Sequence, residues 1–110
     1  MKVFNLIPHP DEKVAFQPSH RLLVPPSSGC YVLSNIDETI LYVGLSNCLA
    51  RRFDQHLDSP DKTAPTPLGR AIWFHWLRYE NLEMLERTWL NSHEVAEGKL
   101  PYFNSVRSPM

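Results

Sequence analysis

The sequence has no excess of either charge and no long apolar run. Its 110 residues carry 11 Lys and Arg against 12 Asp and Glu, a formal net charge of −1. This balance excludes a protein that binds nucleic acid only through a large surplus of cations, but it leaves room for a small local site. Residues 1–9 lack the apolar run of a signal peptide, and no stretch approaches the roughly 18 apolar residues of a membrane span. We therefore expect an intracellular, cytoplasmic protein with no membrane segment.

Cysteine is scarce, and several common catalytic motifs are missing. Cys30 and Cys48 belong to no Cys-x-x-Cys or Cys/His cluster. In a reducing compartment they are expected to be small apolar side chains rather than a disulfide or zinc ligands. The sequence also lacks a glycine-rich phosphate loop, a nucleophile elbow and a carboxylate or His-x-x-x-His cluster for a two-metal site.

Proline, by contrast, is abundant and unevenly placed. None of the ten prolines falls in residues 27–59 or 68–100. Because proline cannot donate to a sheet and breaks helix interiors, we expect the regular structure in these two stretches.

The proline pattern also predicts the domain boundaries. The length suits one domain, which we place at residues 28–105. Residues 1–27 form an N-terminal leader, which either adds an edge strand or remains an adaptable arm. Residues 106–110 form a C-terminal tail.

The first proline-free stretch predicts a β-hairpin. Residues 30–33 and 40–43 are rich in β-branched and aromatic side chains, and polar residues separate them. A connecting loop of two or four residues would place Tyr31 and Tyr42 on the same face, close to directly opposite each other. A loop of three or five residues would separate them.

A helix is expected after the hairpin. Ser46 or Asn47 is a good N-cap, and the helix runs to about residue 57. Its apolar stripe consists of Leu49, Phe53 and Leu57. Arg52 and His56 flank this stripe on one edge, whereas Arg51 falls on the far side of the helix.

The second half of the chain predicts a loop, a strand and a longer helix. Residues 58–67 read as a polar loop and residues 68–71 as one helical turn. Residues 72–77 are a continuous apolar run, consistent with a strand buried on both faces, in which His75 is a core histidine. The last helix begins after Asn81 as N-cap and ends at Gly98.

Glu86 projects into the apolar face of this last helix. It stands four residues after Leu82 and four before Leu90. Burying an unpaired carboxylate costs several kcal/mol, so Glu86 needs a partner. An arginine, a proton or a metal ion would each serve.

Several of these residues together resemble a known family. The tripeptide at residues 29–31, the tripeptide Tyr42-Val43-Gly44, Arg52, Glu86 and Asn104 follow the order and spacing of the GIY-YIG nuclease domain over about residues 28–105. The resemblance implies an α+β fold with a small three-stranded antiparallel sheet flanked by helices. Its element order is strand, strand, helix, short helix, strand, helix, the order that the sequence pattern predicts.

The resemblance also implies roles for individual residues. Family members cleave phosphodiester bonds with a single divalent metal ion, Mg²⁺ or Mn²⁺, which Glu86 would hold. Arg52 would contact the scissile phosphate, and Tyr31 or Tyr42 would orient or deprotonate the attacking water. His56 is similar to a histidine on the same helix in many members. Asn104 corresponds to an asparagine that supports the site. We also expect Gly44 and Arg70 to be supporting or substrate-binding positions.

Two positions depart from the family pattern. Cys30 replaces the usual isoleucine of the first tripeptide, a position that tolerates a change of volume. Leu45 stands where excision-repair members carry a lysine that favours the phenolate of the second tyrosine. The general base is therefore left open among Tyr31, Tyr42 and His56.

Two classes of function remain. The first is a divalent-metal-dependent DNA endonuclease of repair or recombination, with weak intrinsic affinity and targeting by a partner protein, a homodimer or an unusual DNA structure. Its expected DNA contacts are Arg52, Arg70, Arg78, Lys2, Lys13 and Arg21. The alternative is a catalytically silent nucleic-acid-binding or protein-interaction module. In that case the tyrosines only pack in the core, and Arg52 and Glu86 satisfy each other as an ion pair.

Overall fold

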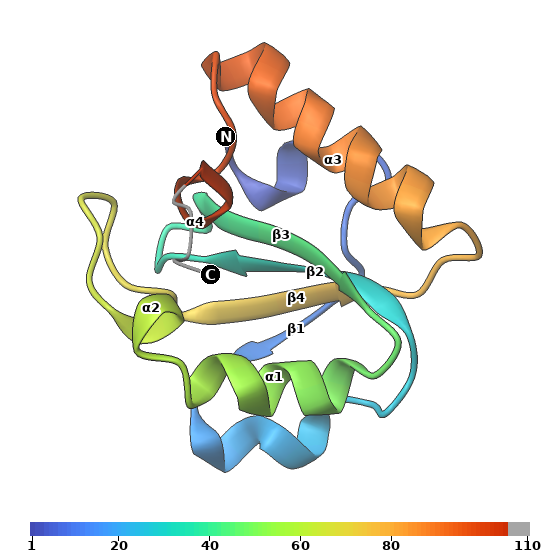
Figure 1. Cartoon of the computed structure of the whole chain (residues 1–110), viewed down its shortest axis with the longest axis vertical. Helices are drawn as coiled ribbons and strands as arrows, with labels where there is room; N and C mark the ends of the chain where they lie inside the picture. The colour runs from blue at the N-terminus through green and yellow to red at the C-terminus, as the bar shows by residue number, and fades with distance from the viewer. Residues whose placement is uncertain (106–110) are drawn as a thin grey trace.

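The computed structural model describes residues 1–105 and shows one antiparallel sheet with the strand order β1-β4-β2-β3 (Figure 1). Its four strands are β1 (Glu12–Ala15), β2 (Gly29–Ser34), β3 (Ile40–Ser46) and β4 (Trp73–Leu77). The predicted α+β class is confirmed, with one strand more than expected because the leader supplies β1. The predicted tail, residues 106–110, lies outside the described residues.

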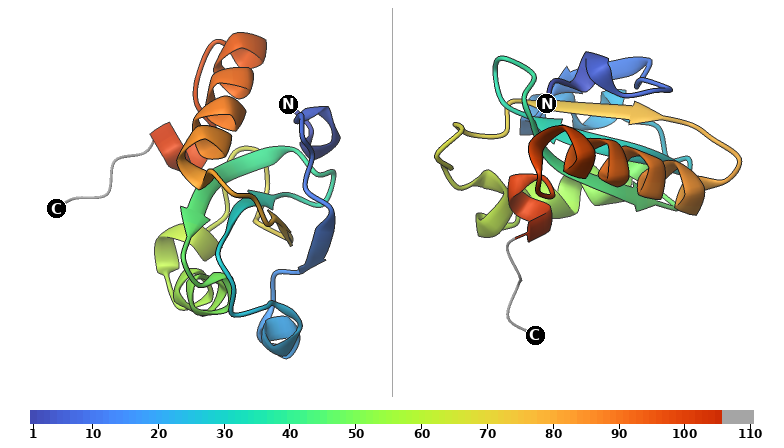
Figure 2. Two further views of the ribbon diagram at one scale, coloured as in Figure 1. Left: turned by 90° about the vertical axis from the view of Figure 1, so that its right-hand side faces the viewer. Right: turned by 90° about the horizontal axis from the view of Figure 1, so that it is seen from above.

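Helices cover both faces of the sheet. They are the 3-10 helices η1 (Val3–Asn5) and η2 (Pro18–Leu23) and the α-helices α1 (Leu49–Leu57), α2 (Pro60–Thr63), α3 (Leu82–Glu97) and α4 (Tyr102–Ser105). α1 and η2 lie on one face, and α3 and η1 lie on the other (Figure 2). Within residues 1–105, no helix has the length and apolar character needed to cross a membrane.

The leader is built into this fold. β1 pairs with β4 along its whole length, from Glu12 opposite Trp76 to Ala15 opposite Trp73. On the α3 face, the indole nitrogen of Trp89 donates to the carbonyl oxygen of Pro8 at 2.8 Å. Residues 1–27 therefore add an edge strand and also contribute side chains to both apolar clusters.

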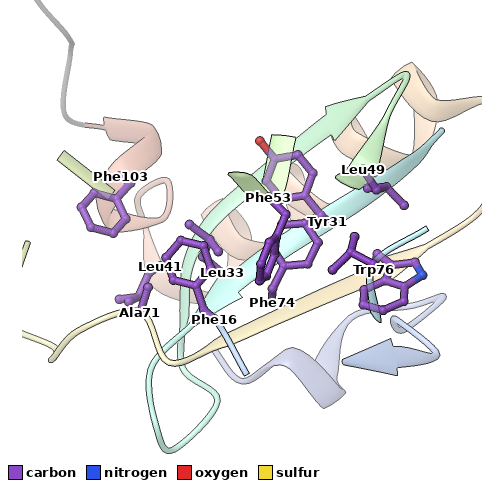
Figure 3. Packing of buried hydrophobic residues seen from close by; sticks show 11 residues of the cluster. Phe16, Tyr31, Leu33, Leu41, Leu49, Phe53, Ala71, Phe74, Trp76 and Phe103 are labelled. Atoms are coloured by element: carbon purple, nitrogen blue, oxygen red, sulfur yellow. The ribbon is translucent and has the colours of Figure 1, made fainter. Parts of the chain in front are cut away.

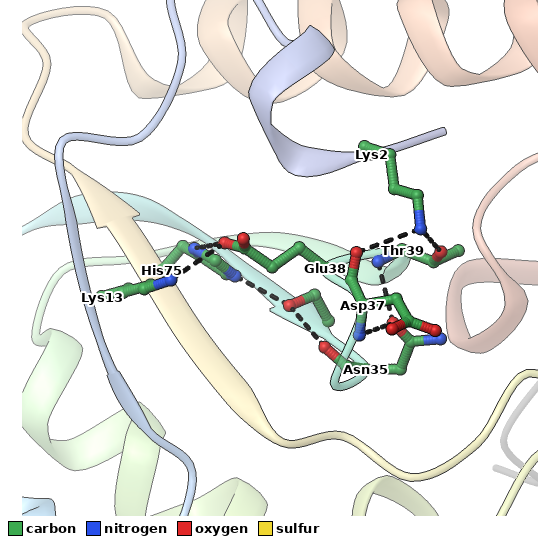
Figure 4. A network of polar contacts seen from close by, with 8 residues as sticks. Lys2, Lys13, Asn35, Asp37, Glu38, Thr39 and His75 are labelled. Atoms are coloured by element: carbon green, nitrogen blue, oxygen red, sulfur yellow. Dashed lines mark hydrogen bonds and ion pairs between the residues drawn. The ribbon is translucent and has the colours of Figure 1, made fainter.

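Lysines of the leader hold the turn between β2 and β3 (Figure 4). The ammonium of Lys2 donates to the carbonyl oxygen of Asp37 at 3.0 Å and to the hydroxyl of Thr39 at 3.1 Å. Lys13 pairs with the carboxylate of Glu38 at 3.3 Å. Glu38 adopts a left-handed backbone, φ 62°, so these contacts fix a turn conformation that a non-glycine residue rarely takes.

A β-bulge sets the face on which the two tyrosines lie. Ser34 pairs with Ile40, but Leu33 pairs with Tyr42, so Leu41 is an extra residue in β3. The loop between the paired strands has five residues, 35–39, and such a loop was predicted to separate Tyr31 from Tyr42. The prediction is wrong here because the bulge shifts the register by one and returns both rings to one face. They lie diagonally rather than directly opposite, because Tyr31 faces Gly44.

The ends of α3 match the sequence prediction, whereas the start of α1 does not. The side chain of Asn81 accepts from the backbone N–H of Met84 at 3.1 Å, and Gly98 closes the helix at φ 75°. α1 begins after Cys48, because Ser46 still belongs to β3. The Ser46 hydroxyl accepts from the backbone N–H of Cys48 at 3.0 Å, so it stabilises the turn between β3 and α1 instead of capping the helix.

The helical turn predicted at residues 68–71 does not form. Gly69 has a left-handed backbone, φ 100°, and its N–H donates to the carbonyl oxygen of Thr66 at 2.9 Å in a tight turn. The short helix of the fold is instead α2, which starts with Pro60 inside the predicted polar loop. Proline is well placed there because the first helical N–H needs no partner.

Aromatic packing in the core fixes the ring of Tyr31. Its ring stacks on Phe74, with centroids 5.1 Å apart, and Phe53 meets Phe74 edge-on at 5.0 Å. Tyr31 is only 1% exposed, and its hydroxyl points away from the cluster (Figure 3). The ring is therefore held rigidly while the oxygen is left to other partners.

Candidate active site

A cleft of about 720 Å³ lies at edge strand β3, between α1 and α3. It is lined by Tyr31, Tyr42, Leu45, Arg52, Glu83, Glu86, Arg87, Leu90, Asn91 and Leu100. Tyr31, Tyr42, Arg52 and Glu86, which the sequence predicted to share a site, all line it. Side chains from two strands and from helices on opposite faces of the sheet thus meet at this cleft.

Gly44 creates the space for the two rings. A Cβ at this position would lie 2.6 Å from the hydroxyl oxygen of Tyr31 and 2.9 Å from Cε2 of Tyr42. No side chain fits without displacing one or both rings, because real Cβ contacts are not that short. The absence of a side chain at Gly44 thus leaves room for both rings.

Tyr31 and His56 form a buried hydrogen-bonded pair. The Tyr31 hydroxyl lies 2.6 Å from Nε2 of His56. Burial, followed by the charges of Lys62 and Arg52, lowers the pKa of His56 to about 3. Burial and the neighbouring Tyr42 raise the pKa of Tyr31, which Arg52 partly opposes. At neutral pH both groups are therefore uncharged, so the tyrosine O–H donates and the imidazole nitrogen accepts.

Tyr42 is the more open of the two tyrosines. Its ring is half-buried, 5.9 Å from the centroid of Tyr31 and 5.5 Å from that of His56. The ammonium of Lys62, from α2, lies 4.9 Å from the centroid of the same ring. Lys62 was not predicted as a site residue, since it stands in the stretch predicted as a polar loop.

Glu86 faces the cleft without a cationic partner. It is half-buried, and within residues 1–105 no Lys, Arg or His nitrogen makes an ion pair with it. The expected alternative of an Arg52–Glu86 pair is therefore not formed. Burial and the nearby charge of Glu83 raise the pKa of Glu86. Of the three partners considered for this carboxylate, a proton and a metal ion remain.

The residues present fit a hydrated hard cation. In the described part of the chain, no three His, Cys, Asp or Glu side chains come together as a metal cage. The cleft offers the Glu86 carboxylate, with Glu83 one helical turn away. Mg²⁺ is commonly held by one or two carboxylates while it keeps several waters, whereas a structural zinc site needs four protein ligands.

Asn104 holds the edge strand β3 from outside the cleft. Its side-chain oxygen accepts from the N–H of Val43, and its side-chain nitrogen donates to the carbonyl oxygen of Val43, both at 2.9 Å. The amide thus pairs with the outer edge of β3 at the residue between Tyr42 and Gly44. This contact fixes the strand segment that carries the open tyrosine.

The other cations proposed for substrate contact lie elsewhere. Arg70 is exposed and does not line the cleft, and Arg78 lines a separate cavity of about 450 Å³. Lys2, Lys13 and Arg21 contact other residues of the chain, and Arg21 lies 3.4 Å from a carboxylate oxygen of Asp54. Among residues 1–105, the cationic residues that line the cleft are Arg52 and Arg87. Arg87 was not predicted as a site residue; its spacing of four residues from both Glu83 and Asn91, which also line the cleft, is the signal that could have indicated it.

Comparison with known families agrees with this geometry. The GIY-YIG catalytic domain matches residues 27–99, which is most of the chain, and the protein belongs to this family. GIY-YIG domains are generally nucleases, so the family indicates a nuclease-type domain and implies a nucleic-acid substrate. No curated protein matches the chain.

Proposed function

We propose that the protein is an endonuclease that hydrolyses DNA phosphodiester bonds with a single divalent ion, Mg²⁺ or Mn²⁺, held by Glu86. The observation that carries this proposal is that Glu86 and Arg52 line one cleft without forming an ion pair. The carboxylate of Glu86 is therefore available to bind a cation, and the guanidinium of Arg52 is available to bind an anion. A purely structural pair would have joined the two.

The charges suit the chemistry of phosphodiester cleavage. Negative charge builds on the non-bridging and leaving oxygens as the phosphorus is attacked, and Arg52 can bind two of these oxygens at once. When bound at Glu86, the metal ion supplies further charge neutralisation and lowers the pKa of water. Arg87 and Asn91, on the α3 side of the cleft, are available for the neighbouring part of the strand.

The Tyr31–His56 pair provides a path for the proton of the attacking water. The Tyr31 oxygen keeps lone pairs that can accept this proton, while its own proton passes along the 2.6 Å hydrogen bond to Nε2 of His56. The negative charge of the bound phosphodiester favours this transfer, because it raises the low pKa of His56. The oxygen of the water then bonds to phosphorus as the leaving oxygen departs. Tyr42, the more open ring, is placed to orient the water or the phosphate.

The small number of cations at the cleft supports weak intrinsic affinity for DNA. In the part of the chain that the structure describes, Arg52 and Arg87 are its cationic lining residues, and the net charge of the chain is −1. We therefore propose that a partner protein, a homodimer or a branched DNA structure delivers the substrate. Repair or recombination in the cytoplasm is the setting that fits this role.

Incubation with supercoiled plasmid and with branched DNA tests the proposal. We expect nicking in Mg²⁺ or Mn²⁺ and none in EDTA. Absence of nicking on both substrates, or nicking by Glu86→Ala at the wild-type rate, would exclude the proposed enzymatic function. DNA binding without nicking would favour the alternative of a catalytically silent binding module.

A further inference from the structure

Lys62 is held between two aromatic rings at the border of the site. Its ammonium lies 4.9 Å from the ring centroid of Tyr42 and 5.5 Å from that of Phe103. Cations are attracted to the faces of aromatic rings, most strongly where they are partly shielded from water. Lys62 is half-buried, so this contact fixes both the lysine and the ring of Tyr42.

The second ring belongs to an element that is itself anchored to the site. Phe103 is 7% exposed and is the neighbour of Asn104, whose amide pairs with Val43 on β3. α4 therefore holds the backbone next to Tyr42 and also supplies the platform for Lys62. α2 and α4, two short helices, meet at one side of the Tyr42 ring.

The charge of Lys62 also reaches the hydrogen-bonded pair. The groups that face His56 are Tyr31 from β2, Tyr42 from β3, Lys62 from α2 and Arg52 from its own helix. After burial, Lys62 is the larger of the two charges that lower the pKa of His56. A bound phosphodiester would act in the opposite direction, because a nearby negative charge favours the imidazolium.

From this geometry, and resting on the proposed function, we propose that Lys62 is a positioning residue of the active site. It holds the Tyr42 ring in place and keeps a positive charge beside the Tyr31–His56 hydrogen bond, so that His56 stays uncharged after the substrate binds and until the attacking water gives up its proton. Arg52 contacts the substrate, whereas Lys62 acts through Tyr42 and His56.

An NMR titration of the full chain, without metal or DNA, tests this role independently of nuclease activity. The side-chain signals of Lys62 should be shifted upfield by the two rings in the wild-type protein. In Lys62→Met, the titration midpoint of His56 should rise by about 1 pH unit, and in Lys62→Arg it should stay near the wild-type value.

Lys13 offers a matched control. Its ammonium lies 4.6 Å from the centroid of Trp73, the same kind of contact outside the cleft. Lys13→Met should leave the His56 midpoint unchanged. The role is overturned if Lys62→Met and Lys13→Met give the same His56 midpoint, or if the Lys62 signals show no upfield shift.

The activity readout separates this inference from the proposed function. If the wild-type protein nicks plasmid, Lys62→Met should lower kcat about tenfold with little change in KM, and Lys62→Arg should restore most of it. An unchanged kcat in Lys62→Met would overturn the positioning role while leaving the nuclease function intact. If the wild-type protein does not nick, the titration alone decides the role of Lys62.

Discussion

Tyr31 lies directly opposite Gly44 in the β2–β3 pair, and the end of its ring occupies the space that a side chain at position 44 would need. Gly44→Ala should therefore displace the Tyr31 hydroxyl from His56 and destabilise the protein by about 1–3 kcal/mol, the usual range for overpacking. Urea unfolding measures the loss, and the Tyr31 hydroxyl proton signal reports the hydrogen bond. A variant with wild-type stability and an intact hydrogen bond would contradict this packing.

Asn104 should matter for stability as well as for the site. Asn104→Ala removes the hydrogen bonds that the Asn104 amide makes with the N–H and the C=O of Val43. We therefore expect a loss of about 1–3 kcal/mol in the free energy of unfolding. Hydrogen exchange of the Val43 amide should accelerate in the variant. Ser105→Ala is a suitable control, because its hydroxyl donates to the carbonyl oxygen of Tyr102 in its own helix. Similar exchange of Val43 in both variants would show that the Asn104 amide does not protect the strand.

Stability should fall in mild acid because of buried histidines. Burial, the larger cause, and Lys13 lower the pKa of His75 to about 4, against a partial opposing effect of Glu38. A histidine in the unfolded chain binds a proton more readily than buried His75. The contribution of neutral His75 to the free energy of unfolding is therefore present above about pH 6.5 and is lost as the pH falls through about 4. The loss from His75 is on the order of 3 kcal/mol. His75→Gln should flatten the dependence of the urea midpoint on pH, whereas His9→Gln, at an exposed position, should not. Equal slopes in all three proteins would exclude this origin.

Replacing Glu86 by Gln should leave the metal-free protein as stable as the wild type or more so. Burial and Glu83 already disfavour the charged carboxylate, and an uncharged amide removes that penalty at neutral pH. Thermal unfolding in EDTA measures the effect. In Mn²⁺ the wild type should gain stability and Glu86→Gln should not. A loss above about 2 kcal/mol in EDTA would instead indicate a structural ion pair.

The main elements could be predicted because their signals are local. Apolar periodicity placed Leu49 and Phe53 of α1 in the core, and cap residues located both ends of α3. The same periodicity placed Arg52 and His56 on the edge of α1 that borders the site, and Arg51 away from it. The resemblance to the family then predicted that residues from separate elements share one site, which no local pattern indicates.

Other parts of the site depend on tertiary structure and gave no local signal. The bulge at Leu41, which brings the tyrosines to one face, follows from the pairing of β3 with β2 rather than from its own sequence. Lys62 reaches Tyr42 only because a four-residue helix forms inside a proline-rich loop. The leader supplies β1 because β4, which pairs with β2 on one side, has a second edge that would otherwise be unpaired. No residue of the leader indicates this pairing on its own.

The most direct test of the proposed nuclease function is the rate of Mg²⁺-dependent nicking of supercoiled plasmid by the wild type, Glu86→Ala, Arg52→Ala and Arg51→Ala. Arg51 is the matched control, since it is exposed and its guanidinium donates to the side chain of Asn47 at 2.8 Å. We predict that the wild type and Arg51→Ala nick at similar rates, and that Glu86→Ala and Arg52→Ala are at least about 100-fold slower. Nicking by Glu86→Ala at the wild-type rate, or none by the wild-type protein, would contradict the account.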